Sequence, residues 1–334
     1  MQHTSFVRLH AALLTLLLIG ANGTAQAKTD DQLGQLLKQR EYGQVDRHAR
    51  ERLRANAADE QAYNFVALAA LAGDASMRED AIPVIKTCTE KLPKSSRCLH
   101  RLGQLYGVAA MSGGMMAAVK YGGQIKDLFI QAVEGDPANF EARRDLVQFY
   151  LQAPGIVGGS VSKAQEQAAA HARVNAQQAK VLELDIHIHR KEWDQAEKLV
   201  GTLGGDDEAS RNAARSATAN LGFALINANL LPRAQKVFEA GLKAQPSSAV
   251  YHFGIGRVQL ESKQVDAAIA ALERATELDP AIGAQYRLGI AYQMKGDKTR
   301  AISNFERFLD VKPPRTGKAA DDARQRLEQL KRPA

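Results

Sequence analysis

One stretch, residues 249–280, constrains the fold of this chain more than any other. It reads AVYHFGIGRVQLESKQVDAAIAALERATELDP and contains two apolar stripes at helical spacing, separated by a polar break at residues 261–264. Small residues at Gly256, Ala268 and Ala275 would let two antiparallel helices approach closely, with Leu272 between them. Pro280 ends the second stripe, because proline lacks a backbone donor and clashes with the preceding turn. The stretch therefore predicts one helix–turn–helix hairpin.

The same pattern occurs on both sides of this hairpin. Ala234, Ala268 and Ala301 are equivalent, so the spacing is 34 residues and then 33. The other repeated anchors are Leu221, Gly222, Leu225, Phe238, Gly241 and Pro246 upstream, and Leu288, Gly289, Tyr292, Phe305, Phe308 and Pro313 downstream. This period, with L-G-x2-Y, A-x3-F and P anchors, resembles the tetratricopeptide repeat family. The resemblance covers about residues 213–314, in units at about 213–246, 249–280 and 282–313. It implies a right-handed superhelix of helix pairs whose concave surface holds a peptide or a partner protein.

Composition agrees with stacked helices. Of the 334 residues 45% are hydrophobic and only 6% are aromatic, and abundant alanine suits helices that pack closely. No run of alternating β-branched residues predicts a strand, so we expect an all-α solenoid. Residues 28–205 fit the repeat loosely and are interpreted as degenerate repeats, whereas 206–314 hold the three regular units. In the last segment, 315–334, an amphipathic helix at 319–331 is expected to cap the apolar end of the stack.

Two insertions interrupt the degenerate half, at 107–123 and 153–160, and both are expected to be loops. The second, APGIVGGS, lacks the G-x-x-x-x-G-K-[ST] pattern of a phosphate loop, so we interpret it as a compact turn with Ser160 capping the next helix. The first contains Met111, Met115 and Met116 beside a Gly-Gly pair. These methionines are expected to fill gaps beneath the inserted loop, with a soft-metal site or an adaptable hydrophobic contact as alternatives.

The first 27 residues resemble a secretory signal peptide. Arg8 precedes an apolar segment at residues 11–19 that is too short to span a bilayer, and Ala25-Gln26-Ala27 offers small residues for cleavage after Ala27. The residue directly after the cut is not a cysteine, so a lipoprotein anchor is not indicated, and no later stretch approaches the length of a membrane helix. The pattern therefore predicts export, most simply into a bacterial periplasm.

The only two cysteines are Cys88 and Cys98, on either side of a predicted helix end at Pro93. In an oxidising compartment two thiols at one inter-helix junction can form a disulfide. Two buried free thiols are the alternative, and the sequence leaves both open.

No enzyme motif is evident. Without its first 27 residues the chain has 43 Lys and Arg against 37 Asp and Glu, and these charges alternate along the helices, which argues against nucleic-acid binding. His187 and His189 lie near Glu192, but two histidines at i and i+2 diverge by about 200° on a helix and chelate poorly. There is no nucleophile elbow and no placed carboxylate pair. We therefore predict a non-enzymatic protein without metal or cofactor.

The resemblance also implies which residues face a partner, because certain first-helix positions line the concave side of such repeats. Here they include Asn220, Phe223, Asn227, Phe253, Arg257, Glu261, Tyr286, Arg287 and Met294. Aromatic and basic side chains would suit an extended segment with an acidic or C-terminal carboxylate group. The paired Lys and Asn of the family's carboxylate clamp are not reproduced. The alternative is an assembly subunit of a cell-envelope complex that acts through its edges and inserted loops.

Overall fold

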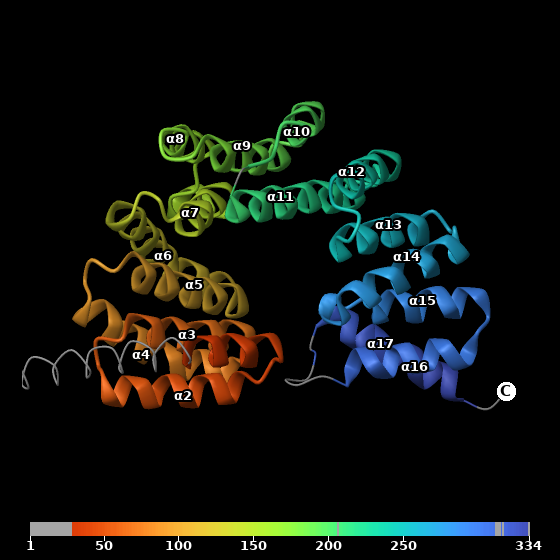
Figure 1. Cartoon of the computed structure of the whole chain (residues 1–334), viewed down its shortest axis with the longest axis horizontal. Helices are drawn as coiled ribbons and strands as arrows, with labels where there is room; N and C mark the ends of the chain where they lie inside the picture. Colours follow the sequence, from red (N-terminus) through yellow and green to blue (C-terminus); the bar gives the residue numbers. More distant parts are fainter. Residues whose placement is uncertain (1–28, 206, 311–314, 316, 333–334) are drawn as a thin grey trace, which may run out of the picture. The chain divides into compact units, whose positions relative to one another are not determined.

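The computed structural model describes residues 29–205, 207–310, 315 and 317–332. Helices make up the ordered structure in these ranges, and no strand occurs in them, so the all-α solenoid prediction is confirmed (Figure 1). The chain divides into two compact units, 1–143 and 144–334. The predicted signal peptide and Pro313 lie outside the described residues.

The first unit is a stack of antiparallel helices in which each helix packs on the next. A helix at 29–38 is followed by α2 (Tyr42–Ala55), α3 (Glu60–Ala72), α4 (Ala75–Lys91), α5 (Ser96–Ser112) and α6 (Gly114–Gly135). Helix starts are fixed locally. The side chains of Asp59, Asp74 and Ser95 each accept a hydrogen bond from a backbone N–H in the first turn, which satisfies donors that the helix itself leaves free.

The second unit continues the pattern from within α7 (Phe140–Gln152). It contains η1 (Gly155–Val157), α8 (Val161–His171), α9 (Ala176–His189), α10 (Trp193–Val200), α11 (Glu208–Asn227), α12 (Leu231–Ala244), α13 (Ala249–Glu261), α14 (Val265–Leu278), η2 (Pro280–Ile282), α15 (Gln285–Lys295), α16 (Lys298–Leu309) and α17 (Lys318–Lys331). The last helix covers the end of the stack as predicted. Ala320 and Ala323 of α17 are buried in the same core as Phe305, and Leu327 and Leu330 pack against it.

The small residues of the repeat allow the two helices of a hairpin to pack closely. A Cβ added at Gly222 would lie 2.3 Å from the Phe238 ring, and one at Gly289 would lie 2.6 Å from Phe305. Phe238 and Phe305 are fully buried. The first helix of these two hairpins therefore needs glycine where the second helix inserts an aromatic ring, since packed cores do not tolerate added atoms.

Polar contacts link each hairpin to the next one along the chain. In the first unit Arg101 donates to Asn64 Oδ1 at 2.8 Å, 37 residues away. In the second unit Arg233 donates to Glu197 Oε1 at 2.7 Å and Tyr251 Oη donates to the Arg215 carbonyl at 3.3 Å, each 36 residues away. The side-chain links thus follow the repeat period, as stacking of like units requires.

The prediction of a loop at 107–123 is wrong, because the extra residues lengthen two helices. Helices α5 and α6 have 17 and 22 residues, against 13 and 14 for α13 and α14. Alanine, valine and methionine continue the helices, and only Gly113 and Gly114 (φ +70°) form the turn. Consequently the three methionines do not fill a gap. Met111, Met115 and Met116 are exposed at the end of the hairpin.

The second insertion, 153–160, is the compact turn that was predicted. Residues 155–157 form one 3-10 turn, Gly158 is left-handed (φ 107°), and the Ser160 side chain accepts a hydrogen bond from Lys163 N as the cap of α8. A left-handed residue is needed to reverse the chain here, which glycine supplies without strain.

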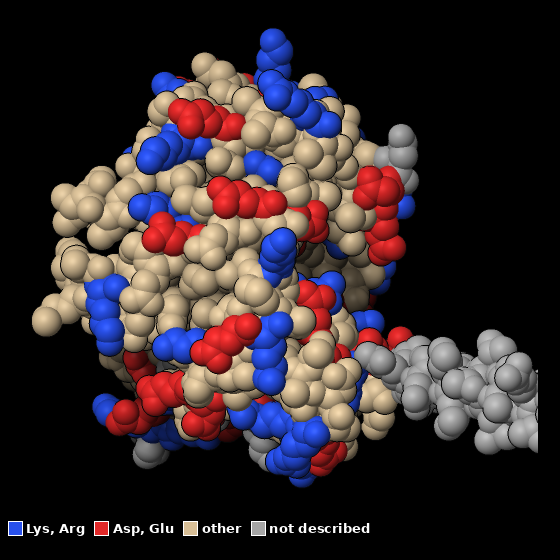
Figure 2. All heavy atoms as spheres, turned by 90° about the vertical axis from the view of Figure 1, so that its left-hand side faces the viewer, with Lys and Arg blue, Asp and Glu red and all other residues tan. Residues whose placement is uncertain are grey.

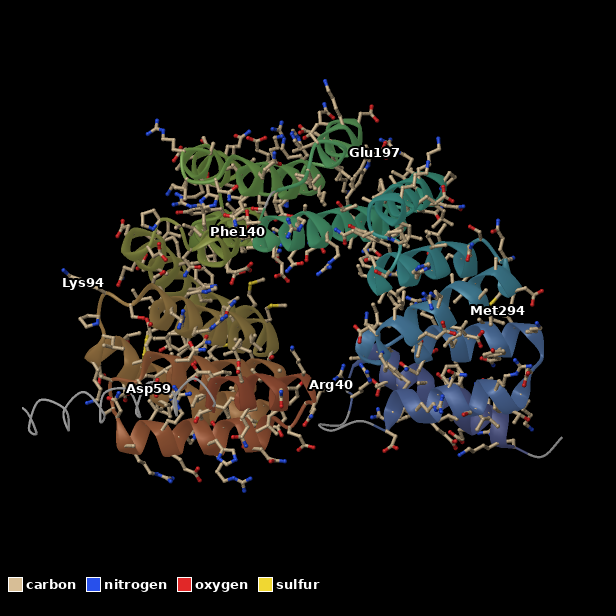
Figure 3. The ribbon with its side chains drawn as sticks, viewed as in Figure 1. Arg40, Asp59, Lys94, Phe140, Glu197 and Met294 are labelled. Carbon is tan, nitrogen blue, oxygen red and sulfur yellow. A yellow bond between two sulfur atoms is a disulfide. The ribbon has the colours of Figure 1, made fainter. Side chains whose placement is uncertain are left out.

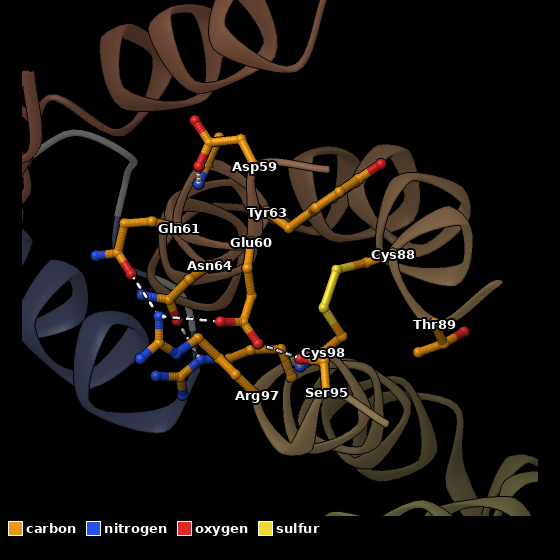
Figure 4. Close-up of a disulfide and its surroundings, with 12 residues drawn as sticks. Asp59, Glu60, Gln61, Tyr63, Asn64, Cys88, Thr89, Ser95, Arg97 and Cys98 are labelled. Atoms are coloured by element: carbon orange, nitrogen blue, oxygen red, sulfur yellow. Dashed lines mark hydrogen bonds and ion pairs between the residues drawn. A yellow bond between two sulfur atoms is a disulfide. The ribbon is translucent and has the colours of Figure 1, made fainter. Parts of the chain in front are cut away.

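Cys88 and Cys98 are joined by a disulfide between α4 and α5 (Figure 4), with Cα atoms 5.8 Å apart. Both cysteines are buried. Beside them Ser95 donates to Glu60, and Arg97 donates to Gln61 Oε1 at 2.6 Å. The junction after α4 is therefore tied to α3 by polar contacts as well as by the covalent bond.

Candidate functional site

The residues predicted to face a partner lie on α11, α13 and α15, the first helices of three successive hairpins in the second unit. We call these nine residues the first-helix surface. The structure brings five of them, Phe223, Phe253, Arg257, Glu261 and Arg287, into one neighbourhood, as the following distances and electrostatic interactions show.

Two aromatic rings form the apolar part of this surface. The Phe223 and Phe253 rings meet edge to face with centroids 6.0 Å apart, and Phe223 also lies 5.2 Å from the buried Phe238 ring. Such tilted pairs are the favourable arrangement for aromatic rings. The hairpin core thus fixes the position of the partly exposed rings.

Arg257 lies over the Phe223 ring with one donor unused. Its Cζ is 5.4 Å from the Phe223 ring centroid, and its Nη2 is 3.4 Å from Glu261 Oε1 one helical turn along. Its Nε is buried and has no hydrogen-bond partner among the described residues. A buried donor without an acceptor is costly, so the Arg257 guanidinium is incompletely satisfied by the described residues.

Arg287 adds a second cation from the next hairpin. Its Cζ lies 5.6 Å from the Tyr286 ring centroid, and it forms neither a hydrogen bond nor an ion pair with any residue that the structure describes. Burial lowers the pKa of Arg287, the positive charge of Arg257 lowers it further, and the negative charge of Glu261 opposes both. Two positively charged guanidinium groups therefore lie on this surface, and the negative charge of Glu261 neutralises them only in part.

Tyr286 points toward the capping helix instead of a partner. Its hydroxyl donates to Asp322 Oδ2 at 2.7 Å, and Arg326 donates to the same oxygen at 2.6 Å. Burial raises the pKa of Tyr286, and the hydrogen bond with Asp322 raises it further. The sequence did not indicate Asp322. It lies in the predicted final helix, but spacing alone does not show which neighbour that helix reaches.

Three predicted residues lie apart from this cluster. Asn220 and Asn227 are exposed on α11, and among the described residues neither forms a hydrogen bond with Arg257 or Arg287. Met294, labelled in Figure 3, lies on α15 with 47% of its surface exposed. The structure thus offers a compact aromatic and basic patch, with these side chains outside it.

Charges elsewhere are mixed in sign. Figure 2 shows Lys and Arg interspersed with Asp and Glu on the face turned to the viewer. His187 Nδ1 lies 2.7 Å from Glu192 Oε2, and Arg190 pairs with the same carboxylate. Within the described ranges no group of three or more His, Cys, Asp and Glu side chains is placed to hold a metal ion. Among the same residues no helix is long and apolar enough to cross a membrane.

Comparison with family models identifies the class. Residues 249–282 and 284–311 each match a tetratricopeptide repeat model. These are two of the three units that the anchor spacing predicted. Residues 249–311 therefore contain tetratricopeptide repeats, and such repeats are protein-interaction scaffolds, generally without catalytic activity.

Curated relatives match only part of the chain. It is 32% identical over 109 residues to a peroxisomal targeting signal receptor of Komagataella phaffii, covering 30% of this chain and 19% of that protein. A receptor of the same name from Pichia angusta is 32% identical over 94 residues, covering 28% and 16%. The chain thus spans less than a fifth of the length of these relatives.

A solved structure shares the fold over a longer range. The crystal structure of yeast Tom70 matches with a TM-score of 0.62 and 17% identity, covering 87% of this chain and 58% of that one. At this identity the likeness concerns the fold alone, and it agrees with the stacked helix pairs seen here.

Proposed function

We propose that the protein is an exported interaction module that binds an extended peptide segment on its first-helix surface. The segment would present an acidic side chain or a C-terminal carboxylate to Arg257 and Arg287. One observation carries the proposal. Two neighbouring guanidinium groups, held by aromatic rings, keep donors unpaired by the described residues. Planar guanidinium groups bind carboxylates through paired, charge-assisted hydrogen bonds.

The aromatic rings supply the second half of the recognition. Phe223 and Phe253 are partly exposed next to Arg257, so an apolar side chain adjacent to the carboxylate could pack on them. Aromatic and arginine side chains together are typical of residues that dominate binding energy in protein interfaces. The relatives named as targeting signal receptors support a role in binding another protein, but they give no support to this particular site.

The test uses a display library of random ten-residue peptides with free C-termini, selected against the purified full chain. The best binder is then synthesised with a carboxylate and with an amide terminus, alongside versions in which each acidic side chain becomes its amide. We expect removal of the recognised carboxylate, and the R257Q/R287Q double substitution, each to weaken binding by about tenfold or more.

Arg274 provides the matched control. It is an exposed arginine on α14, the second helix of the same hairpin, where it pairs with Glu277. R274Q should leave peptide affinity unchanged. Equal binding by all the neutralised peptides, or an equal loss with R274Q, would rule out the arginine pair as the binding site.

Export is a separate part of the proposal and rests on the signal-like residues 1–27. Expressed in a Gram-negative bacterial host, the protein should be released with the periplasmic fraction and begin at Lys28. N-terminal sequencing of the released protein checks this, and retention of the intact N-terminus in the cytoplasm would contradict it.

A further inference from the structure

A second interaction surface lies in the first unit, where the long α5–α6 hairpin extends beside the start of α4. Four apolar side chains at its end are strongly exposed: Met111 (85%), Met115 (73%), Met116 (87%) and Val119 (53%). Three of the six methionines of the chain fall within residues 111–116. Solvent-exposed apolar side chains grouped in this way mark a site of association, whereas single ones are common on any surface.

The hairpin end borders a hollow of about 700 Å³. One wall is α4, with Ala75, Arg78, Glu79 and Ile82, and the other is the end of the hairpin, with Ala109, Met116, Lys120 and Tyr121 among its residues. Both apolar and charged side chains therefore line the hollow. We call it, together with the four exposed apolar side chains, the hairpin-tip groove.

Positive charge is in slight excess in the groove lining, which has two basic side chains, Arg78 and Lys120, and one acidic side chain, Glu79. Lys120 lies 4.9 Å from the Tyr121 ring centroid and forms no ion pair with a described residue. Glu79 is the acidic side chain of the groove lining, opposed there by Arg78 and Lys120. The groove consequently favours an anionic partner.

The walls decide the form of that partner. Both are helices, and an amphipathic helix that lies in a groove between helices is recognised through its apolar side chains. Methionine adapts its shape to such a partner. A flat lipid surface would contact the exposed tip but not the α4 wall.

We propose that the hairpin-tip groove binds an amphipathic helix of a partner protein, one with an apolar stripe facing the methionines and acidic residues beside Lys120. This site is independent of the first-helix surface, which lies in the other unit. It gives the protein two attachment points of different chemistry, one for a carboxylate-bearing extended segment and one for an acidic helix.

The test is a selection against the full chain from a display library of 20-residue helices. Apolar residues occupy every third or fourth position of each helix, and Glu, Lys, Gln or Ser occupies the others. We expect the selected helices to contain more Glu than Lys. M116Q and K120E should each weaken binding by about tenfold, E79Q should strengthen it, and M294Q, an exposed methionine of the other unit, should leave it unchanged.

Methyl NMR of ¹³C-labelled methionine gives a second readout. A selected helix should shift the Met111, Met115 and Met116 signals and leave Met294 in place. Selected helices without acidic bias, or binding that survives both M116Q and K120E, would overturn the proposal. So would binding to anionic phospholipid vesicles that is lost in an M111Q/M115Q/M116Q variant while no helix is selected, because the tip would then be a lipid contact.

Discussion

Tyr286 Oη donates a 2.7 Å hydrogen bond to Asp322 Oδ2, and this bond joins the last repeat to the helix that closes the stack. The two residues lie 36 positions apart, the same separation as in the links between repeats. Helix α17 thus occupies the place of a further repeat's first helix. A cap of this kind shields the apolar end of a solenoid while presenting a polar outer face.

Asp322 should make the stability of the second unit depend on pH. Burial alone would raise the pKa of Asp322, but hydrogen bonds from Arg326 and Tyr286, with the charges of Arg326 and Arg287, outweigh it and lower the pKa. A lowered folded-state pKa stabilises the fold above the ordinary pKa of aspartate, and this contribution is lost as pH falls through the folded-state value.

D322N should therefore lower the free energy of unfolding at pH 7 by about 1 kcal/mol or less, since the side chain is about a third exposed and solvent screens it. Near pH 2 the variant and the parent should unfold at the same temperature. Thermal melts at both pH values check this. D321N, at an exposed neighbouring position, is the control, and a pH-independent difference for D322N would contradict the assignment.

Gly103 and Gly107 on α5 are a matched pair that tests whether close packing of two helices requires glycine. A Cβ at Gly103 would lie 2.5 Å from the Phe129 ring, whereas one at Gly107 meets nothing within 4 Å. G103A should destabilise the first unit by about 1–3 kcal/mol through overpacking. G107A should stabilise it by about 0.5–1 kcal/mol, because alanine is the better helix former. Denaturant melts of both variants test the pair, and similar effects would refute the packing explanation.

Arg144 and Asp185 form a buried ion pair between α7 and α9. Arg144 Nε lies 2.8 Å and Nη2 3.2 Å from the two carboxylate oxygens, and the Asp185 side chain is almost fully buried. D185A should lower the free energy of unfolding by about 3 kcal/mol, because it leaves the guanidinium of Arg144 without this partner. The double variant R144M/D185L should recover much of the loss. Urea unfolding measures both, and additive losses in the double variant would show that the charges do not act as a pair.

The disulfide should stabilise the first unit. Closing a loop between Cys88 and Cys98, ten positions apart, removes conformations from the unfolded chain and contributes about 2–3 kcal/mol in the entropic account. Reductant should lower the denaturant midpoint of the parent, and C88S/C98S should start at the lower midpoint and not respond to reductant. If reductant left the denaturant midpoint of the parent protein unchanged, the prediction would be contradicted.

The regular hairpins could be predicted from sequence because their anchors are local and repeat. Gly222 and Gly289 meet Phe238 and Phe305 in the structure, as the repeated small and aromatic positions require. The end of the α5–α6 hairpin could not be predicted in the same way. Gly113 and Gly114 indicated a long loop, but the alanines and methionines around them carry enough helix propensity to leave only a turn.

The candidate site was predictable in part. Repeat geometry placed Arg257 and Arg287 at first-helix positions that line the concave side. In the structure the positive charges of the two residues lie close enough to interact. Spacing could not show that Arg257 Nε is buried without a hydrogen-bond partner among the described residues. Nor could it show that Asp322 accepts a hydrogen bond from the Tyr286 hydroxyl. Both depend on side-chain directions across neighbouring helices, which a period in the sequence does not encode.

The links between residues about 36 positions apart have a mechanical consequence. Each hairpin in a unit is held chiefly by the hairpin before it and the one after it. A pulling force would therefore peel hairpins from an end in steps, each releasing a similar length of chain. Either unit could act as an extensible spring that lengthens under load and rewinds when the load is removed.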